Sequence, residues 1–187
     1  VPVRVLSSFL KPGEPNPGTL VCSEEEIVEK QVVSGVAYSR DEAKITLFGM
    51  PDKPGVSAKL FAVLAQSGIN VDMIVQANAR GPDRANMVFT CTDRDSPFAK
   101  ETLEKMKDEI GFDSMEVTRD VSKVSIIGVG MKSHTGVAET MFRALSEKNI
   151  NIDVIATSEI KISVLIAAPY TELAVRALHT AFGLDAE

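Results

Sequence analysis

Two loop motifs in this sequence carry residues that suit the binding of a small anionic group. Asp52–Val56 reads Asp-Lys-Pro-Gly-Val, and Ser133–Val137 reads Ser-His-Thr-Gly-Val. Each motif opens a predicted amphipathic helix, whose first turn leaves backbone N–H groups free and carries a partial positive charge. The glycine lets a ligand approach the backbone closely. Both motifs are therefore candidate sites for a carboxylate.

An amide and a carboxylate stand at the start of the strand that follows each helix. They are Asn70 and Asp72 in the first half of the chain, and Asn151 and Asp153 in the second. Such a pair of oxygen-bearing side chains can hold an ammonium group. The N–H groups at the start of the helix and the polar side chains at the start of the strand together indicate a site for a free amino acid. The alternative is that Pro-Gly and Asn only shape turns, and the recurrence of the same residues leaves both interpretations open.

The recurrence has a fixed spacing of 81 residues. Gly49–Ile74 matches Gly130–Ile155 at ten of 26 ungapped positions, and matches fall in the loops and strand starts as well as in the helices. Helical periodicity shared by two unrelated segments does not account for this. The chain therefore contains an internal repeat.

Hydrophobic periodicity predicts that each copy follows the order β-α-β-β-α-β, the ferredoxin-like plan. The first copy is predicted as strand Lys44–Gly49, loop Met50–Pro54, helix Gly55–Ser67, strands Val71–Ala77 and Asn86–Thr92, helix Pro97–Ile110, and strand Phe112–Thr118. The second is predicted as strand Val124–Gly128, loop Met131–Thr135, helix Gly136–Glu147, strands Ile152–Thr157 and Ile160–Ala167, and helix Glu172–Phe182. The predicted fold class is α/β (α+β), with antiparallel sheets covered by helices on one face.

The second copy lacks a fourth strand, whereas Gln31–Ala37 is a predicted strand without a partner ahead of the first copy. Arg40–Glu42 reads as a turn between that strand and the first copy. We predict that Gln31–Ala37 completes the second sheet. The domains are then residues 44–119 for the first copy, and residues 31–37 plus 120–187 for a discontinuous second one. Residues 1–30 hold a short strand and a Pro/Gly-rich linker.

Composition argues against several classes of function. The net charge is −6 and no basic stripe is visible, which disfavours nucleic-acid binding. No apolar run reaches the ~18 residues of a membrane span. Cys22 and Cys91 are far apart and belong to no metal-binding pattern, so we expect two reduced thiols and a cytoplasmic protein.

Catalytic and nucleotide-binding patterns are also missing from the sequence. Gly128-Val129-Gly130 would need a third glycine where Ser133 stands, and no Gly-Lys-Ser/Thr occurs. His134 and His179 have no neighbours typical of a metal site or a catalytic triad. We therefore expect no catalytic residue, no metal and no cofactor in this chain.

The motifs resemble the regulatory region of aspartate kinase, with its two ACT domains. Gly49–Gly55 with Ile69–Ile74 is similar to the first ACT domain of that family, and Gly130–Val137 with Thr157–Val164 to the second. Arg4–Phe9 with Pro17–Val21 resembles the end of the kinase domain. The kinase-like start favours a fragment over a separate small subunit. The kinase active-site motifs are absent, so ATP and Mg would belong to the kinase domain, and this chain alone should not phosphorylate aspartate.

The resemblance implies feedback inhibition of lysine, threonine and methionine biosynthesis by lysine, threonine or both. It implies effector sites between ACT domains, a homodimer paired through them, and a kinase domain or subunit as partner. Carried over, the first site takes Met50, Asp52, Gly55, Val56, Asn70, Asp72 and Gln76, with Asn151 and Ile152 from a facing ACT domain. The second takes Met131, Ser133, His134, Gly136, Val137, Asp153, Thr157, Ser158 and Glu159. The alternative function is a dimerisation scaffold without a ligand.

Overall fold

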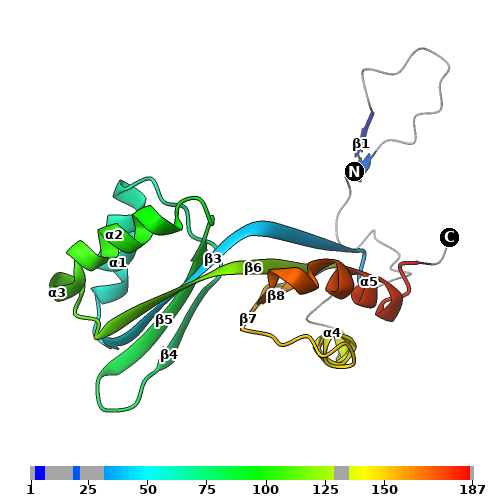
Figure 1. Cartoon of the computed structure of the whole chain (residues 1–187). Helices are drawn as coiled ribbons and strands as arrows, with labels where there is room; N and C mark the ends of the chain where they lie inside the picture. Colours follow the sequence, from blue (N-terminus) through cyan, green and yellow to red (C-terminus); the bar gives the residue numbers. More distant parts are fainter. Residues whose placement is uncertain (1–2, 7–18, 22–31, 129–134, 186–187) are drawn as a thin grey trace.

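The structure is a computed structural model that describes residues 3–6, 19–21, 32–128 and 135–185 of the 187-residue chain. The predicted linker and three predicted site residues (Met131, Ser133 and His134) lie outside these ranges. Two short N-terminal strands, β1 (Val3–Val5) and β2 (Thr19–Val21), form an antiparallel pair of their own. The rest of the described chain is built around one larger sheet (Figure 1).

That sheet has six strands in the order β4-β5-β3-β6-β8-β7, and all neighbours are antiparallel. The strands are β3 (Gly35–Pro51), β4 (Ile74–Asn78), β5 (Arg84–Cys91), β6 (Ser114–Ile127), β7 (Val154–Thr157) and β8 (Lys161–Ala167). The helices are α1 (Val56–Gln66), α2 (Ser96–Lys105), α3 (Lys107–Ile110), α4 (Val137–Ser146) and α5 (Thr171–Ala181), with a short 3-10 turn, η2 (Ala168–Tyr170), before α5. The ferredoxin-like α/β fold with antiparallel strands is confirmed.

Strands β3 and β6 are long because each passes through both halves of the molecule (Figure 1). The prediction of a turn at Arg40–Glu42 is wrong, since these residues lie inside β3. Likewise, Phe112–Thr118 and Val124–Gly128 are not separate strands but parts of β6. The pairing register shifts around Glu42, on both sides of its contact with Val121. The sheet therefore changes direction there, and both strands continue through the change.

We define two modules on either side of this point. The first module comprises the later part of β3, the α1–α3 region and Ser114–Thr118 of β6. The second comprises Val121–Ile127 of β6, the α4–α5 region and Gly35–Ser39 of β3. Gly35–Ser39 pairs with Lys123–Ile127, so the early strand lies beside the second module's first strand. The domain limits given above stay a prediction.

Each module has its own core, and a third core joins the two. Leu60, Leu103 and Phe89 lie in the first module's core, and Met141, Leu178 and Ile126 in the second's. The third core contains Met73 and Val121 together with Val154 and Leu165. Because neighbouring residues of a strand point to opposite faces, Leu165 lies on the face away from its neighbours Val164 and Ile166, which pack in the second module's core. The third core thus lies on the face without helices.

Three smaller differences from the sequence prediction matter for the site. The predicted helix Pro97–Ile110 is interrupted at Met106 and becomes α2 and α3. Strand β4 begins at Ile74, so Asp72 precedes it. Met50, predicted in a loop beside the ligand, lies in β3 and is 2% exposed in the first module's core. Its side chain is therefore part of the hydrophobic core in this structure.

Candidate functional site

The predicted loop-to-helix junctions share an unusual backbone conformation. Gly55 and Gly136, the residues before α1 and α4, have φ of 93° and 97°. L-residues with a side chain rarely adopt this left-handed conformation, so the sequence needs glycine at both places. Gly55 is exposed, and a Cβ added there would meet nothing within 4 Å. The side of Gly55 on which a Cβ would stand is thus open.

A hydrogen-bond chain ties the first module's loop to its edge strand. The Gln76 side-chain N–H donates to Asp52 Oδ1 at 3.3 Å, and Ser57 Oγ donates to Gln76 Oε1 at 3.2 Å. Gln76 lies on β4, and Ser57 lies in the first turn of α1. The structure therefore brings together Asp52, Gly55 and Gln76 of the predicted first site. Val56 is half-buried beside them.

Ser57 was not among the predicted site residues. The 81-residue shift places it opposite Ala138, Asp52 opposite Ser133, and Gln76 opposite Thr157. Three positions that touch one another in the first module thus differ together in the second. A pairwise alignment of the copies would reveal the change, but only the structure shows that these side chains meet.

Fewer of the residues predicted for the second site fall within the described ranges. Thr157, Ser158 and Glu159 are exposed at the end of β7 and in the turn to β8. Ser158 N–H donates to the Lys161 carbonyl at 2.8 Å, which closes that turn. Val137 is 8% exposed and packs in the second module's core. In the described part, the structure does not join this turn to Gly136 through a hydrogen bond.

The two strand-start aspartates are engaged with lysines of the opposite module. Asp72 hydrogen-bonds Lys123 of β6, and Asp153 Oδ2 lies 3.0 Å from Lys44 Nζ of β3. Asp72 and Gln76 are four positions apart along near-extended chain, which is about 13 Å at the usual rise per residue. The structure therefore does not place Asp72 with the Asp52–Gln76 contact. Asp72 belongs to the boundary between the modules.

Asn70, Asn151 and Ile152 lie in the turns that lead into β4 and β7. Asn70 and Asn151 are exposed, and Asn151 Nδ2 donates to Asp153 Oδ1 at 3.4 Å. Asn151 and Ile152 also line a groove of about 440 Å³ together with the end of α4, including Phe142 and Ser146. Both predicted residues are therefore accessible from this groove.

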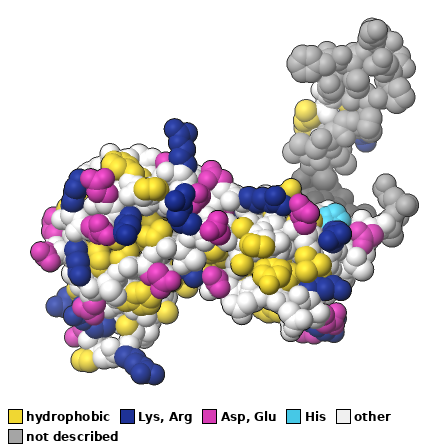
Figure 2. Space-filling view, in the orientation of Figure 1, with side chains coloured by type: hydrophobic (Ala, Val, Ile, Leu, Met, Phe, Trp, Pro, Cys, Tyr) yellow, Lys and Arg dark blue, Asp and Glu magenta, His cyan; other side chains and the backbone are white. Residues whose placement is uncertain are grey.

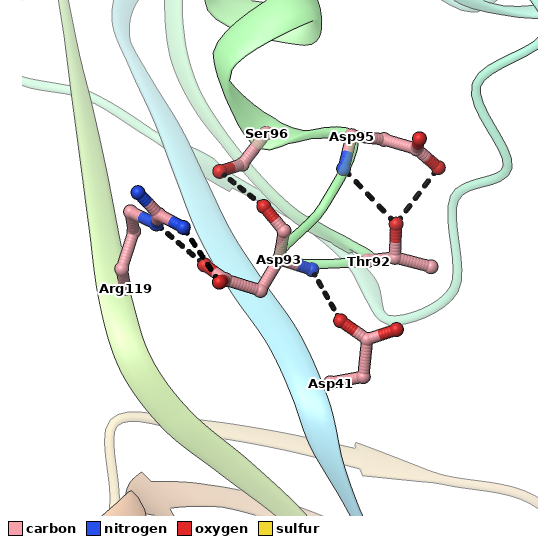
Figure 3. Close-up of polar contacts among 6 residues, drawn as sticks. All are labelled: Asp41, Thr92, Asp93, Asp95, Ser96 and Arg119. Carbon is pink, nitrogen blue, oxygen red and sulfur yellow. Dashed lines mark hydrogen bonds and ion pairs between the residues drawn. The ribbon is translucent and has the colours of Figure 1, made fainter.

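A second polar network lies where β3 passes β6 (Figure 3). Arg119 makes two hydrogen bonds to Asp93, of 2.6 and 2.7 Å, and Asp93 N–H donates to Asp41 Oδ1. The hydrogen bond from Arg119 holds the pKa of Asp93 below its ordinary value. Cys91 lies close by, and burial, together with the charges of Asp95 and Glu42, raises the pKa of its thiol to about 11. These contacts lie close to the module boundary. Among the described residues, no group of three or more His, Cys, Asp or Glu side chains is placed to hold a metal ion.

Comparison with known families shows the same module twice. Residues 44–111 and residues 124–182 each match a family model described as an ACT domain. The aspartate kinase of Pseudomonas putida is 49% identical over the whole chain, which spans 44% of that protein. The regulatory subunit of aspartate kinase from Thermus thermophilus, solved in a ligand-free form, is 47% identical, with a TM-score of 0.75. That match covers 81% of this chain and 99% of the subunit.

The chain belongs to the aspartate kinase family, in its ACT-domain regulatory part. It spans less than half the length of the aspartate kinases that it matches. A more distant member, Escherichia coli aspartokinase III, shares the fold at 23% identity and a TM-score of 0.68 over 88% of this chain and 36% of that one. No helix in the described ranges is both long and apolar enough to cross a membrane.

Proposed function

We propose that this chain is the amino-acid-sensing region of an aspartate kinase, and that it binds lysine, threonine or both between ACT domains. The observation that carries the proposal is the arrangement at the first module's loop. Gln76 holds Asp52 beside the open backbone of Gly55, at the start of a helix. This arrangement offers N–H groups to a carboxylate and a carboxylate to an ammonium group. The carboxylate and the ammonium group of a free amino acid would thus each have a binding partner.

A distant relative supports an amino acid as the effector. The structure of E. coli aspartokinase III that shares this fold was solved in complex with lysine and aspartate. For this chain, the identity of the effector rests on the resemblance and on the geometry of the loop. The coordinated differences between Asp52, Ser57 and Gln76 and their counterparts in the second module favour two sites with different preferences.

The mechanism we infer is thermodynamic linkage. An effector that binds one arrangement of the ACT domains more tightly than another shifts the population toward the arrangement that it binds more tightly. The size of the shift is set by the ratio of its affinities for the two arrangements. A kinase domain or a separate kinase subunit would respond to that shift, and ATP, Mg and aspartate would bind there. The place of such feedback control is the first step of lysine, threonine and methionine biosynthesis, in the cytoplasm.

The two edges of the sheet suit pairing with a second copy. Strands β4 and β7 are the edge strands, and Ile74 and Ile155 occupy equivalent positions on them. These isoleucines are 47% and 43% exposed. An exposed edge strand with an apolar side chain is a ready surface for another strand. A homodimer through the ACT domains would cover both, and the same surface would serve the alternative function, a dimerisation scaffold without an effector.

Isothermal titration of this chain with L-lysine and with L-threonine, separately, tests the proposal. We expect heat from at least one of them, and we expect Gln76→Ala to weaken binding at the first site because Asp52 loses the group that orients it. Gln66→Ala is the matched control, since Gln66 is an exposed glutamine at the far end of α1. Absence of heat from both amino acids would leave the scaffold as the better account.

A further inference from the structure

Strand β3 contains a bulge shortly before the loop that leads into α1. Between the Leu47–Met87 pair and the Met50–Ala85 pair, two residues of β3 lie opposite a single residue of β5. The second of the two is Gly49, which has a left-handed φ of 63°. One extra residue in one of two paired strands, here with such a glycine, is a β-bulge. Strand β3 thus gains one residue on β5 just before the proposed first site.

The bulge decides which face of the sheet Asp52 lies on. Side chains alternate between the two faces along a regular strand, and one extra residue reverses the alternation beyond it. Leu47 and Met50 are three positions apart, yet both lie in the first module's core, under the helices. Asp52 follows Met50 by two positions and so lies on the same side. Gln76 lies there too, because it pairs with Met87 of that core. Without the bulge, Asp52 would face away from Gln76.

Two side chains of β5 hold the bulge by its backbone. The bulge interrupts the ladder, so the peptide groups of Gly49 need other partners. The Gly49 N–H donates to Asn86 Oδ1 at 3.0 Å, and Arg84 Nη1 donates to the Gly49 carbonyl. Arg84 Nη1 also donates to the Gly111 carbonyl at 3.3 Å, and its Nη2 lies 3.4 Å from Asp113 Oδ1. Arg84 therefore ties the bulge to the segment between α3 and β6.

The backbone continues this attachment as far as Asp52. Pro51 pairs with Arg84 at the end of the ladder, and the Asp52 N–H donates to the Asp83 carbonyl at 2.8 Å. Arg84 and Asp83 belong to the hairpin that β4 and β5 form, and Gln76 lies on β4 of the same hairpin. The hairpin that carries Gln76 thus also fixes the backbone position of Asp52.

The second module has no strand in the place that holds Arg84 and Asn86. Gly128 is the counterpart of Leu47 in the 81-residue repeat, and its N–H donates to the Ile160 carbonyl. Strand β8 begins only after Ile160, so the positions beyond that contact lie in the turn between β7 and β8. In the described part of the chain, this clamp on a bulge therefore belongs to the first module alone.

We propose that Arg84 and Asn86 are positioning residues of the first effector site. By holding the bulge at Gly49, they set Asp52 beside Gln76. The inference rests on the proposed function, in which the Asp52 carboxylate binds the effector's ammonium group. Neither positioning residue has to touch the effector. When the clamp is lost, a smaller fraction of the molecules keeps the loop in the binding geometry, and the apparent affinity falls in proportion to that fraction.

Titration of the full chain and its variants with L-lysine and with L-threonine tests this role, with each fold checked by thermal melting. The first site is the one at which Asp52→Ala weakens binding. We expect Arg84→Met and Asn86→Ala each to weaken binding at this site about tenfold and to leave binding at a second site unchanged. Arg84→Lys keeps one donor for the Gly49 carbonyl and should recover most of the loss. An arginine that only stabilises the fold would lower the melting temperature and leave the affinity as it was.

Arg80→Met is the matched control, because Arg80 is exposed in the turn of the same hairpin and carries the same charge. In an Asp52→Ala background, Arg84→Met should cause no further loss, since the group that it positions is gone. Wild-type protein that binds neither amino acid overturns the proposed function and this role with it. Wild-type binding with first-site affinity unchanged in Arg84→Met and Asn86→Ala, or lowered equally by Arg80→Met, overturns the positioning role alone. If Arg84→Met does not fold, Asn86→Ala decides by the same criterion.

Discussion

Gly55 and Gly136 lie 81 residues apart and share a left-handed backbone, with φ of 93° and 97°. Both stand directly before a helix at the proposed carboxylate-binding turn. The repeat has thus kept a backbone conformation while the neighbouring side chains Asp52 and Ser57 have their counterparts in Ser133 and Ala138. The glycines shape the turn, and in the proposed function the surrounding residues would set which ligand each turn prefers.

Replacing Gly55 by alanine should destabilise the chain through the backbone alone. No atom lies within 4 Å of the added Cβ, so the cost is the left-handed conformation itself, about 1–2 kcal/mol. Urea unfolding measures it. Gly35→Ala is the matched control, because Gly35 also has free space but no positive φ. Gly55→Asn should cost less than Gly55→Ala, since asparagine tolerates this conformation better; equal losses for Gly35 and Gly55 would contradict the argument.

The repeat and the helices could be predicted from the sequence because their signals are local. Apolar residues at helical spacing gave α1, α4 and α5 to within a residue or two at each end. The continuity of β3 could not be predicted in this way. Arg40–Glu42 is a charged run that looks like a turn, yet Glu42 is buried because Lys123, far along the chain, neutralises it. Tertiary pairing overrides local preference at this point.

The site was predictable in part for the same reason. The loop motif and the family resemblance predict Asp52, Gly55 and Gln76 as site residues, and the structure joins Asp52 to Gln76 by a hydrogen bond close to Gly55. Their role in effector binding stays a prediction. Ser57 was missed because a serine in the first turn of a helix is ordinary. Asp72 was expected beside them, but it pairs with Lys123, which is 51 residues away and carries no local signal of that contact. Long-range ion pairs decide where such a side chain points.

The Arg119–Asp93 pair should make stability depend on pH in the acidic range. The folded pKa of Asp93 lies below its unfolded value because Arg119 hydrogen-bonds the carboxylate. Its stabilisation is therefore complete above the unfolded pKa, about 3.9, and is lost as the pH falls through the folded pKa. Both side chains are partly exposed and solvent screens the pair, so we expect only a small contribution at pH 7. Urea unfolding of wild type, Arg119→Met, Asp93→Asn and the double variant at pH 7 and pH 3 isolates the pair. A coupling that persisted unchanged at pH 3 would contradict this account.

Cys91 should resist thiol reagents in the folded protein. Burial, followed by the charges of Asp95 and Glu42, raises the pKa of its thiol to about 11, so little thiolate is present at pH 8. With an unfolded value of 9.0, the folded thiolate fraction is about a hundredfold smaller at that pH. A Cys22→Ser variant leaves Cys91 as the one thiol in the chain. We expect its labelling in native buffer to be slower than in urea by at least that factor, and to accelerate about tenfold per pH unit up to about pH 10.

The same shift in Cys91 has a consequence for stability at high pH. Because the folded pKa of the thiol is raised, the folded state keeps its proton while the unfolded state loses it. This contribution is complete below the unfolded pKa and is lost as the pH rises toward about 11. Cys91→Ala in the Cys22→Ser background should flatten this part of the pH profile of urea unfolding. An unchanged profile would assign the alkaline loss to other groups.

Charges placed on the sheet edges should weaken self-association. Ile74 and Ile155 are equivalent exposed isoleucines on β4 and β7, and a glutamate there would face a partner strand with an unpaired charge. We expect Ile74→Glu and Ile155→Glu each to raise the dissociation constant of a dimer about tenfold or more, as for a buried interface side chain. Sedimentation velocity over a range of concentrations measures it. Phe98→Glu is the control, because Phe98 is 53% exposed on α2, away from either edge. If the Phe98 variant dissociates and the two isoleucine variants do not, the helix face and not the sheet edge forms the interface.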